Sequence, residues 1–290
     1  MDIKSYLAGR LAEFLNREKP IPSGSLPMTD YERLSEEVRR ADVLLVEGRS
    51  RVSEVIKIIT NSSWTHAVVY IGRFDEIPEG ALLNKVAEYY SGDPRDQLII
   101  EVLLGRGTIV APLRKYAGKH LRICRPRSLS RNDRDQVIAY AINQLGHDYD
   151  IRQMLDLARF MLPYSIIPRR WRSTLFEHNP GDSTKNVCSS MLAAAFDSVR
   201  YPILPIARLM QDGSVQLLRR NVKLNTPKDF DYSPYFDIIK HPYFNFDEIA
   251  AYRSLPWDKQ GVICNVEGDC FMPGQLSAGV GEVRSQDRGQ

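Results

Sequence analysis

Five short apolar runs between residues 42 and 124 constrain the fold of this chain more than any other feature. They are rich in branched side chains and cover residues 43–46, 67–71, 98–104, 108–111 and 121–124. Apolar runs of this length, with turn residues between them, are typical of strands rather than helices. The first half of the chain is therefore predicted to form a β-sheet.

Helical spacing of apolar residues surrounds this predicted sheet. It predicts an amphipathic helix over residues 3–15, a short helix over 52–59 and a longer one over 130–145 that Gly146 terminates. Another apolar helix begins at Cys188. Strands and helices together predict an α+β fold, with an antiparallel sheet packed against helices that include the one bearing Cys188.

A capping box is expected ahead of a further short helix. Thr29 and Glu32 have the spacing at which a threonine hydroxyl accepts from one backbone N–H and a glutamate returns the bond. Packing onto the main domain is the simplest role for the first 40 residues, and membrane docking is the alternative.

Composition excludes some classes of protein. The chain has 290 residues, 43% of them hydrophobic and 26% charged, enough for one large domain or two small ones. Its net charge of +3 is mild and its basic residues are dispersed, so nucleic acid is not expected as a partner.

We expect an N-terminal extension over 1–40, a catalytic domain over 41–245, a C-terminal extension over 246–271 and a disordered tail over 272–290.

Neither a secretory signal nor a transmembrane segment is expected from the sequence. The N-terminus lacks an uninterrupted apolar region, and no run of about 20 apolar residues occurs. A cytoplasmic location is therefore expected. Peripheral membrane contact stays open, because an apolar stretch over 154–167 precedes a basic aromatic segment over 169–172. That order fits an interfacial segment or a core helix with a solvated basic end.

The cysteines other than Cys188 and the histidines other than His66 suggest no metal site. Cys124 lies in a predicted strand and is interpreted as a buried hydrophobe. Cys264 and Cys270 can bridge under oxidation, but free thiols are favoured in a chain of this size. Four histidines lack ligand-like spacing, namely His120, His147, His178 and His241. No metal or organic cofactor is expected.

Cys188 is the candidate nucleophile. A thiol at a helix N-terminus meets the positive end of the helix dipole, which favours the reactive thiolate. His66, which enters a predicted strand directly after a loop, is the candidate base. The alternatives are a buried structural thiol and a hydrogen-bonded core histidine.

Glu101 is the candidate third member, because it is the only charged residue in the apolar run 98–104. A carboxylate in such a strand must be paired or hydrogen-bonded. Orienting His66 would satisfy it. The alternative is a buried salt bridge with Arg106 or Arg114.

Six segments, in order, carry a family resemblance: residues 41–48, 60–72, 100–101, 145–150, 186–190 and 226–234. They resemble the permuted papain-like cysteine hydrolases, which are YaeF/YiiX-like relatives of the NlpC-type cell-wall peptidases. The resemblance covers roughly residues 41–240. The departures are Ala41, where glycine is common, and Thr65, where serine is common.

The resemblance implies a circularly permuted papain-like fold of the NlpC type, in which the histidine precedes the cysteine. It implies Cys188 as nucleophile, His66 as general base and then acid, and Glu101 as the group that holds the imidazole. Tyr149, Ser189 and Trp64 are candidates for binding the oxyanion or the substrate. Chain order is no objection, since geometry defines such a site.

The expected function is hydrolysis of an amide, such as a cell-wall peptide, through a thioester acyl-enzyme. One alternative is a lipid-directed acyltransferase or phospholipase resembling lecithin:retinol acyltransferase. The other is a binding protein that keeps the fold without catalysis. The sequence leaves the natural substrate, the choice between hydrolysis and acyl transfer, and the oligomeric state open.

Overall fold

The computed structural model describes residues 10, 13–19, 26–147, 188–244, 249–258, 261–264 and 270–272. These residues fall into two compact units. The first unit contains the described residues up to Tyr243, and the second those from Phe244 onward. No helix in the described ranges is long and apolar enough to cross a bilayer.

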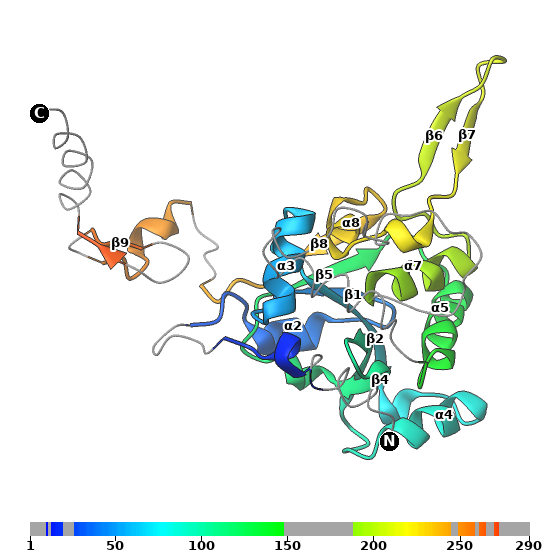
Figure 1. Ribbon diagram of the computed structural model, residues 1–290, viewed down its shortest axis with the longest axis horizontal. Helices are drawn as coiled ribbons and strands as arrows, with labels where there is room; N and C mark the ends of the chain where they lie inside the picture. Colours follow the sequence, from blue (N-terminus) through cyan, green and yellow to red (C-terminus); the bar gives the residue numbers. More distant parts are fainter. Residues whose placement is uncertain are drawn as a thin grey trace, which may run out of the picture. The chain divides into compact units, whose positions relative to one another are not determined.

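A six-stranded sheet forms the centre of the first unit (Figure 1). Every neighbouring pair of its strands is antiparallel. In spatial order the strands are β4 (Gly107–Pro112), β3 (Gln97–Leu103), β2 (His66–Arg73), β1 (Val43–Val46), β5 (Leu121–Pro126) and β8 (Phe236–Ile239). The five predicted strands are confirmed, and β8 is an addition that the sequence did not suggest.

Both faces of the sheet are buried, which explains why its strands read as nearly continuous apolar runs. Val43 and Leu45 point into one hydrophobic cluster, whereas Leu44 and Val46 point into another. The first cluster is covered by the helices α4 (Ala81–Tyr89), α5 (Arg131–Asn143) and α7 (Cys188–Ser198). The second is covered by α2 (Tyr31–Glu37) and the 3-10 turn η2 (Leu113–Tyr116). This mixture of helices and antiparallel sheet confirms the predicted α+β class.

The predicted helices are found with small shifts of boundary. Residues 51–60 form α3 (Arg51–Thr60), and Ser130 caps α5 by accepting from the Asp133 N–H. Gly146 follows α5 with a φ of 81°, a conformation that favours glycine. Of the predicted helix over 3–15, residues 10 and 13–15 are described and are helical. Helix α4 was not predicted.

The capping box proposed for Thr29 and Glu32 is wrong. Asp30 caps α2 instead, and its carboxylate accepts from the Arg33 N–H at 3.2 Å. The Thr29 hydroxyl accepts from the Leu121 N–H at 2.9 Å and contacts the Leu121 carbonyl at 3.2 Å. Long-range bonds to β5 thus displaced the local cap, which spacing alone could not reveal. The predicted boundary at residue 40 stays a prediction, although Leu34 of α2 lies in the second cluster.

Four aromatic side chains hold α7 against the C-terminal part of this unit. Phe196 of α7 lies 5.3 Å from Phe236 of β8 and 6.3 Å from Phe230 of α8 (Pro227–Tyr232), measured between ring centroids. Tyr201 completes the cluster, 5.6 Å from Phe236. The cluster therefore fixes the helix that begins at Cys188 against the strand at the edge of the sheet.

A two-stranded hairpin leaves the body of the first unit after α7 (Figure 1). It consists of β6 (Ile206–Leu209) and β7 (Val215–Leu218), and nearly all of its side chains are exposed. The second unit contains η6 (Ala251–Ser254) and the short strands β9 (Ile263–Cys264) and β10 (Cys270–Phe271).

The expectation of free thiols at Cys264 and Cys270 is wrong, because the two form a disulfide. Antiparallel pairing of β9 with β10 places the two cysteines directly opposite each other, with their Cα atoms 4.0 Å apart. The sequence indicated a loop between them but not the strand pairing that aligns them. Cys124 is buried, as predicted.

Phe230→Ala should destabilise the first unit by about 3–5 kcal/mol, because it removes a fully buried ring from the aromatic cluster. Urea unfolding followed by circular dichroism would measure the loss. Tyr232→Ala is the control in the same helix, where the side chain is 65% exposed. Its effect should stay within about 0.5 kcal/mol, and equal losses at the two positions would contradict the packing described.

Candidate active site

His66 is the first residue of β2, next to the loop that joins β1 to α3. The Gly48 N–H donates to the Thr65 hydroxyl at 2.9 Å, which ties this loop to the start of the strand. A Cβ at Gly48 would lie 2.2 Å from Ser53 Oγ and 2.7 Å from Thr65 Oγ1. A side chain at this position would displace Ser53 or Thr65, so the close approach favours glycine. Thr65 therefore has a structural role beside the candidate base.

His66 and Glu101 are brought together by strand register. Val69 pairs with Ile100 and Tyr70 with Ile99. Continuing this register places Glu101 opposite Val68, diagonal to His66 on the same face of the sheet, where long side chains reach one another. His66 Nε2 lies 2.8 Å from Glu101 Oε2. The hypothesis that Glu101 orients His66 therefore has its geometry in the structure.

Glu101 has two further donors, both from η2. Lys115 Nζ lies 2.5 Å from Oε1, and the Tyr116 hydroxyl donates to Oε2 at 2.5 Å. Neither of the alternative partners, Arg106 and Arg114, takes this place, and Arg114 pairs instead with Asp96. Sequence reasoning missed Lys115 and Tyr116. The only signal for them was that a buried carboxylate needs partners.

The carboxyl of Glu101 is ionised although it is fully buried. Burial by itself would raise its pKa, but the hydrogen bond and charge of His66, together with the charge of Lys115, outweigh burial and bring the pKa to about 2. The Glu101 carboxylate is thus a fixed negative charge beside Nε2 of His66 at any pH near neutral.

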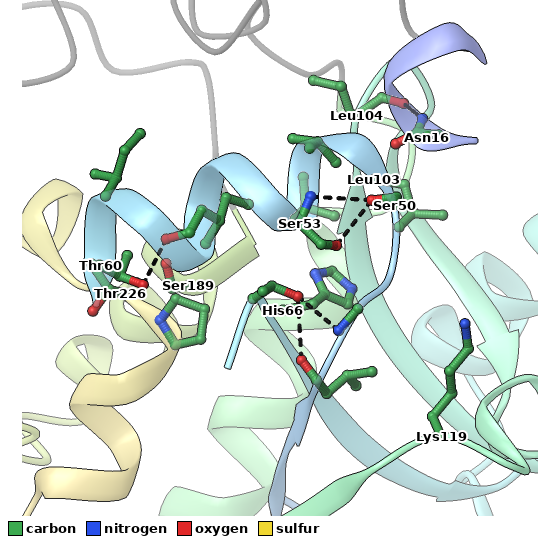
Figure 2. A pocket seen from close by; sticks show the side chains of 18 of the residues that line it. Asn16, Ser50, Ser53, Thr60, His66, Leu103, Leu104, Lys119, Ser189 and Thr226 are labelled. Carbon is green, nitrogen blue, oxygen red and sulfur yellow. Dashed lines mark hydrogen bonds between the residues drawn. The ribbon is translucent and has the colours of Figure 1, made fainter. Parts of the chain in front are cut away.

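A cavity of about 470 Å³ opens beside His66, within the range of roughly 300–1,000 Å³ typical of ligand sites. Figure 2 shows His66 under α3, with Ser189 and Thr226 toward one end and Leu103 and Leu104 toward the other. Ser189 lies in the first turn of α7. The cavity therefore joins the candidate base to the start of the helix that Cys188 opens.

Cys188 is the first residue of α7, as the sequence predicted. Its side chain and Tyr149 lie outside the part of the chain that the structure describes. The segments 154–167 and 169–172 and His178 also lie outside it. Ser189 lines the cavity, but its hydroxyl donates to the Asn225 carbonyl at 2.6 Å. That bond ties the start of α7 to the loop before α8.

Trp64 is buried, and it is not among the described residues that line the cavity. Its ring packs 4.9 Å from the ring of His120 and 4.7 Å from the guanidinium of Arg122. Arg122 in turn donates to both carboxylate oxygens of Asp231 at 2.7 and 2.8 Å. These contacts give Trp64 a packing role and give the sequence motif 226–234 a structural one.

His120 also binds Glu47, with Nδ1 and Oε2 2.9 Å apart. The hydrogen bond from His120, and then that from Lys57, lower the pKa of Glu47 to about 2 against the opposing effect of burial. In the described ranges, no group of three or more His, Cys, Asp or Glu side chains is arranged to hold a metal ion.

The low pKa of Glu101 predicts how stability changes in acid. Because the pKa falls from 4.5 to about 2 on folding, the carboxylate stabilises the fold fully above pH 4.5, and this is lost as the pH falls through 2. Glu101→Gln should therefore be less stable than the parent by on the order of 3 kcal/mol at pH 6. That gap should shrink toward pH 2 in urea titrations. With Glu36→Gln, at an exposed position, the gap should stay constant; a constant gap for Glu101→Gln would refute the assignment.

Comparison with known proteins identifies a family that matches part of this chain. Residues 37–158 match the family model described as "Permuted papain-like amidase enzyme, YaeF/YiiX, C92 family". This segment contains His66 and Glu101 and ends before Cys188. No curated protein matches the sequence.

Among solved structures, the chain is similar to one described as the crystal structure of the metalloprotein yiiX from Escherichia coli O157:H7. The identity is 11% and the TM-score 0.42, over 70% of this chain and 97% of that chain. The resemblance that the sequence motifs predict is confirmed by the family match, and it is residues 37–158 that match the permuted papain-like amidases.

Proposed function

We propose that this protein is a cysteine hydrolase that cleaves an amide bond with Cys188 as nucleophile, His66 as base and Glu101 as the group that orients His66. The observation that carries the proposal is the His66–Glu101 pair, 2.8 Å apart, in which Glu101 is fully buried and His66 lines a cavity that also reaches the first turn of α7. The amidase family match over residues 37–158 supports the same class of reaction.

The proposed reaction has two halves. With Nε2 of His66 turned to Glu101, Nδ1 takes the proton of the Cys188 thiol, and the thiolate attacks the substrate carbonyl carbon. The C–N bond breaks as His66 returns the proton to the leaving amine, which leaves a thioester. Water then attacks the thioester, giving up a proton to His66, and the acid is released as the thiol regains its proton.

Glu101 favours this cycle by its fixed charge. A carboxylate at Nε2 keeps that nitrogen protonated and stabilises the imidazolium that forms when Nδ1 takes a proton. Lys115, at Oε1, and Tyr116, at Oε2, hold the carboxylate in place. We propose the backbone N–H of Cys188, at the N-terminus of α7, as one donor to the oxyanion and Tyr149 as the second.

A second candidate is a lipid-directed acyltransferase or phospholipase that uses the same three residues on an ester. The observation that favours it is the number of aliphatic side chains in the cavity wall. A binding protein without catalysis is the third reading.

Labelling with iodoacetamide tests the nucleophile. At pH 7 the reagent should modify Cys188, whereas Cys124 should stay unmodified, because burial raises the pKa of its thiol. Peptide mass spectrometry would locate and quantify the label. Without an imidazole partner the thiolate is less favoured, so His66→Ala should slow labelling of Cys188 by roughly tenfold or more.

Hydrolysis of amide substrates should be abolished in Cys188→Ala and reduced by roughly 10²-fold or more in His66→Ala. His147→Ala is the control, since His147 lies in an exposed turn after α5. A Cys188 that labels equally fast with and without His66, in a protein that turns over neither amides nor esters, would favour the binding protein.

A further inference from the structure

The Glu101 carboxylate has a cationic partner besides His66. Lys115 Nζ lies 2.5 Å from Oε1, whereas His66 Nε2 lies 2.8 Å from Oε2. The Tyr116 hydroxyl, a neutral donor, also donates to Oε2, at 2.5 Å. Each carboxylate oxygen therefore has a donor that is independent of His66. The ammonium matches the charge of the carboxylate before the imidazole takes up any proton.

The turn η2 fixes the ammonium in this place. Leu113 and Tyr116 are both buried in the second hydrophobic cluster. Side chains three residues apart in a 3-10 turn lie on the same side, so these two residues anchor the turn to the sheet. Lys115 Nζ lies 5.2 Å from the centre of the Tyr116 ring. A lysine side chain that is 36% exposed is thus positioned on the carboxylate by a turn that packs into the core.

The two charges next to His66 act on it in opposite directions. A buried carboxylate beside Nε2 favours the imidazolium. A histidine held as the imidazolium cannot take a proton from a thiol. The Lys115 ammonium on the other oxygen of the same carboxylate opposes this effect, because two positive charges close together in a site of low polarity repel each other.

Other charged side chains line the same cavity but are not donors to Glu101. Among the residues that the structure describes, the donors to Glu101 are His66, Lys115 and Tyr116. Lys119 pairs with Glu18 instead. The further charged residues of the lining are Arg106, in the turn between β3 and β4, and Lys223. The contact at Oε1 therefore distinguishes Lys115 from the other cations of the cavity.

We propose, resting on the function proposed above, that Lys115 is a positioning residue whose ammonium offsets the Glu101 carboxylate, so that His66 stays unprotonated and able to act as a base at neutral pH. Glu101 orients the imidazole, and Lys115 limits how strongly the carboxylate attracts a second proton to it. Tyr116 has the same effect to a smaller degree, because its hydroxyl shares Oε2 with His66.

An NMR titration of the histidine rings tests the proposal without any substrate. Full-length Cys188→Ala serves as the parent, so the thiol cannot contribute a charge, and His66→Gln in that background identifies the His66 signals. Lys115→Gln can still donate to Oε1 but has no charge. The midpoint of the His66 titration should therefore move up by roughly 1–2 pH units.

Lys115→Arg separates charge from side-chain identity. It keeps the positive charge, so the midpoint should stay close to that of the parent. An unmoved midpoint in Lys115→Gln, or an equal movement in both variants, would overturn the proposal. Circular dichroism checks folding. If Lys115→Gln does not fold, Lys115→Met, whose flexible chain fills the same space without charge, replaces it with the same expected result.

Lys119→Gln is the matched control for the titration. It removes the same charge from the lining of the same cavity, but Lys119 pairs with Glu18 and lies apart from His66 in Figure 2. The midpoint should move much less than in Lys115→Gln. An equal movement would show that His66 responds to the summed charge of the cavity, and would overturn the role of the contact between Lys115 and Glu101.

The pH dependence of amide hydrolysis gives a second readout, in the protein that retains Cys188. Because only unprotonated His66 acts as the base, kcat/KM of Lys115→Gln should fall roughly tenfold or more at pH 6 and approach the parent value as the pH rises above the new midpoint. A loss of the same size at every pH is the result expected of a merely structural lysine, and would contradict the proposal.

The two readouts separate this inference from the hydrolase function. If Lys115→Gln leaves the His66 midpoint in place while the parent protein cleaves amides, the inference fails and the hydrolase stands. If the midpoint moves as expected but the protein with Cys188 intact cleaves no amide, the effect of the Lys115 charge on His66 stands and the hydrolase function fails.

Discussion

The carboxylate of Glu101 is the group on which the geometry of the site depends. A charge buried in an apolar strand is tolerated only with partners on several sides. Here His66, Lys115 and Tyr116 converge on it from β2 and from η2. The same contacts orient the imidazole and attach η2 to the sheet, so fold stability and the proposed chemistry share one set of hydrogen bonds.

The sheet supplies the rigidity that this arrangement needs. Its two faces are both covered, so the strands that carry His66 and Glu101 cannot shift without disturbing two hydrophobic clusters. The loop through Gly48 and helix α3 cover the site. Glycine at position 48 allows this loop to pass close to Thr65 and Ser53. The cavity is thus bounded by rigid elements, as a preorganised site requires.

Much of the fold was predictable from local pattern, and the failures have physical causes. Strand β1 coincides with its predicted range because an apolar run buried on both faces leaves little ambiguity. Asp30 rather than Thr29 caps α2, because the Thr29 hydroxyl bonds to β5, far along the chain. Ala41, a departure from the family pattern, has a φ of 68° in the region that favours glycine. The common glycine there answers a backbone need, and this chain meets that need with alanine.

The sequence by itself determined which chemical groups are present and in what order: a histidine entering a strand, a lone carboxylate in an apolar run and a thiol opening a helix. These follow from residue type and spacing, which are local properties. Tertiary structure decided that Glu101 meets His66 with Lys115 and Tyr116 behind it, and that Trp64 packs rather than lines the cavity. Such choices depend on strand register and long-range packing, and no local pattern encodes the distance between residues brought together by folding.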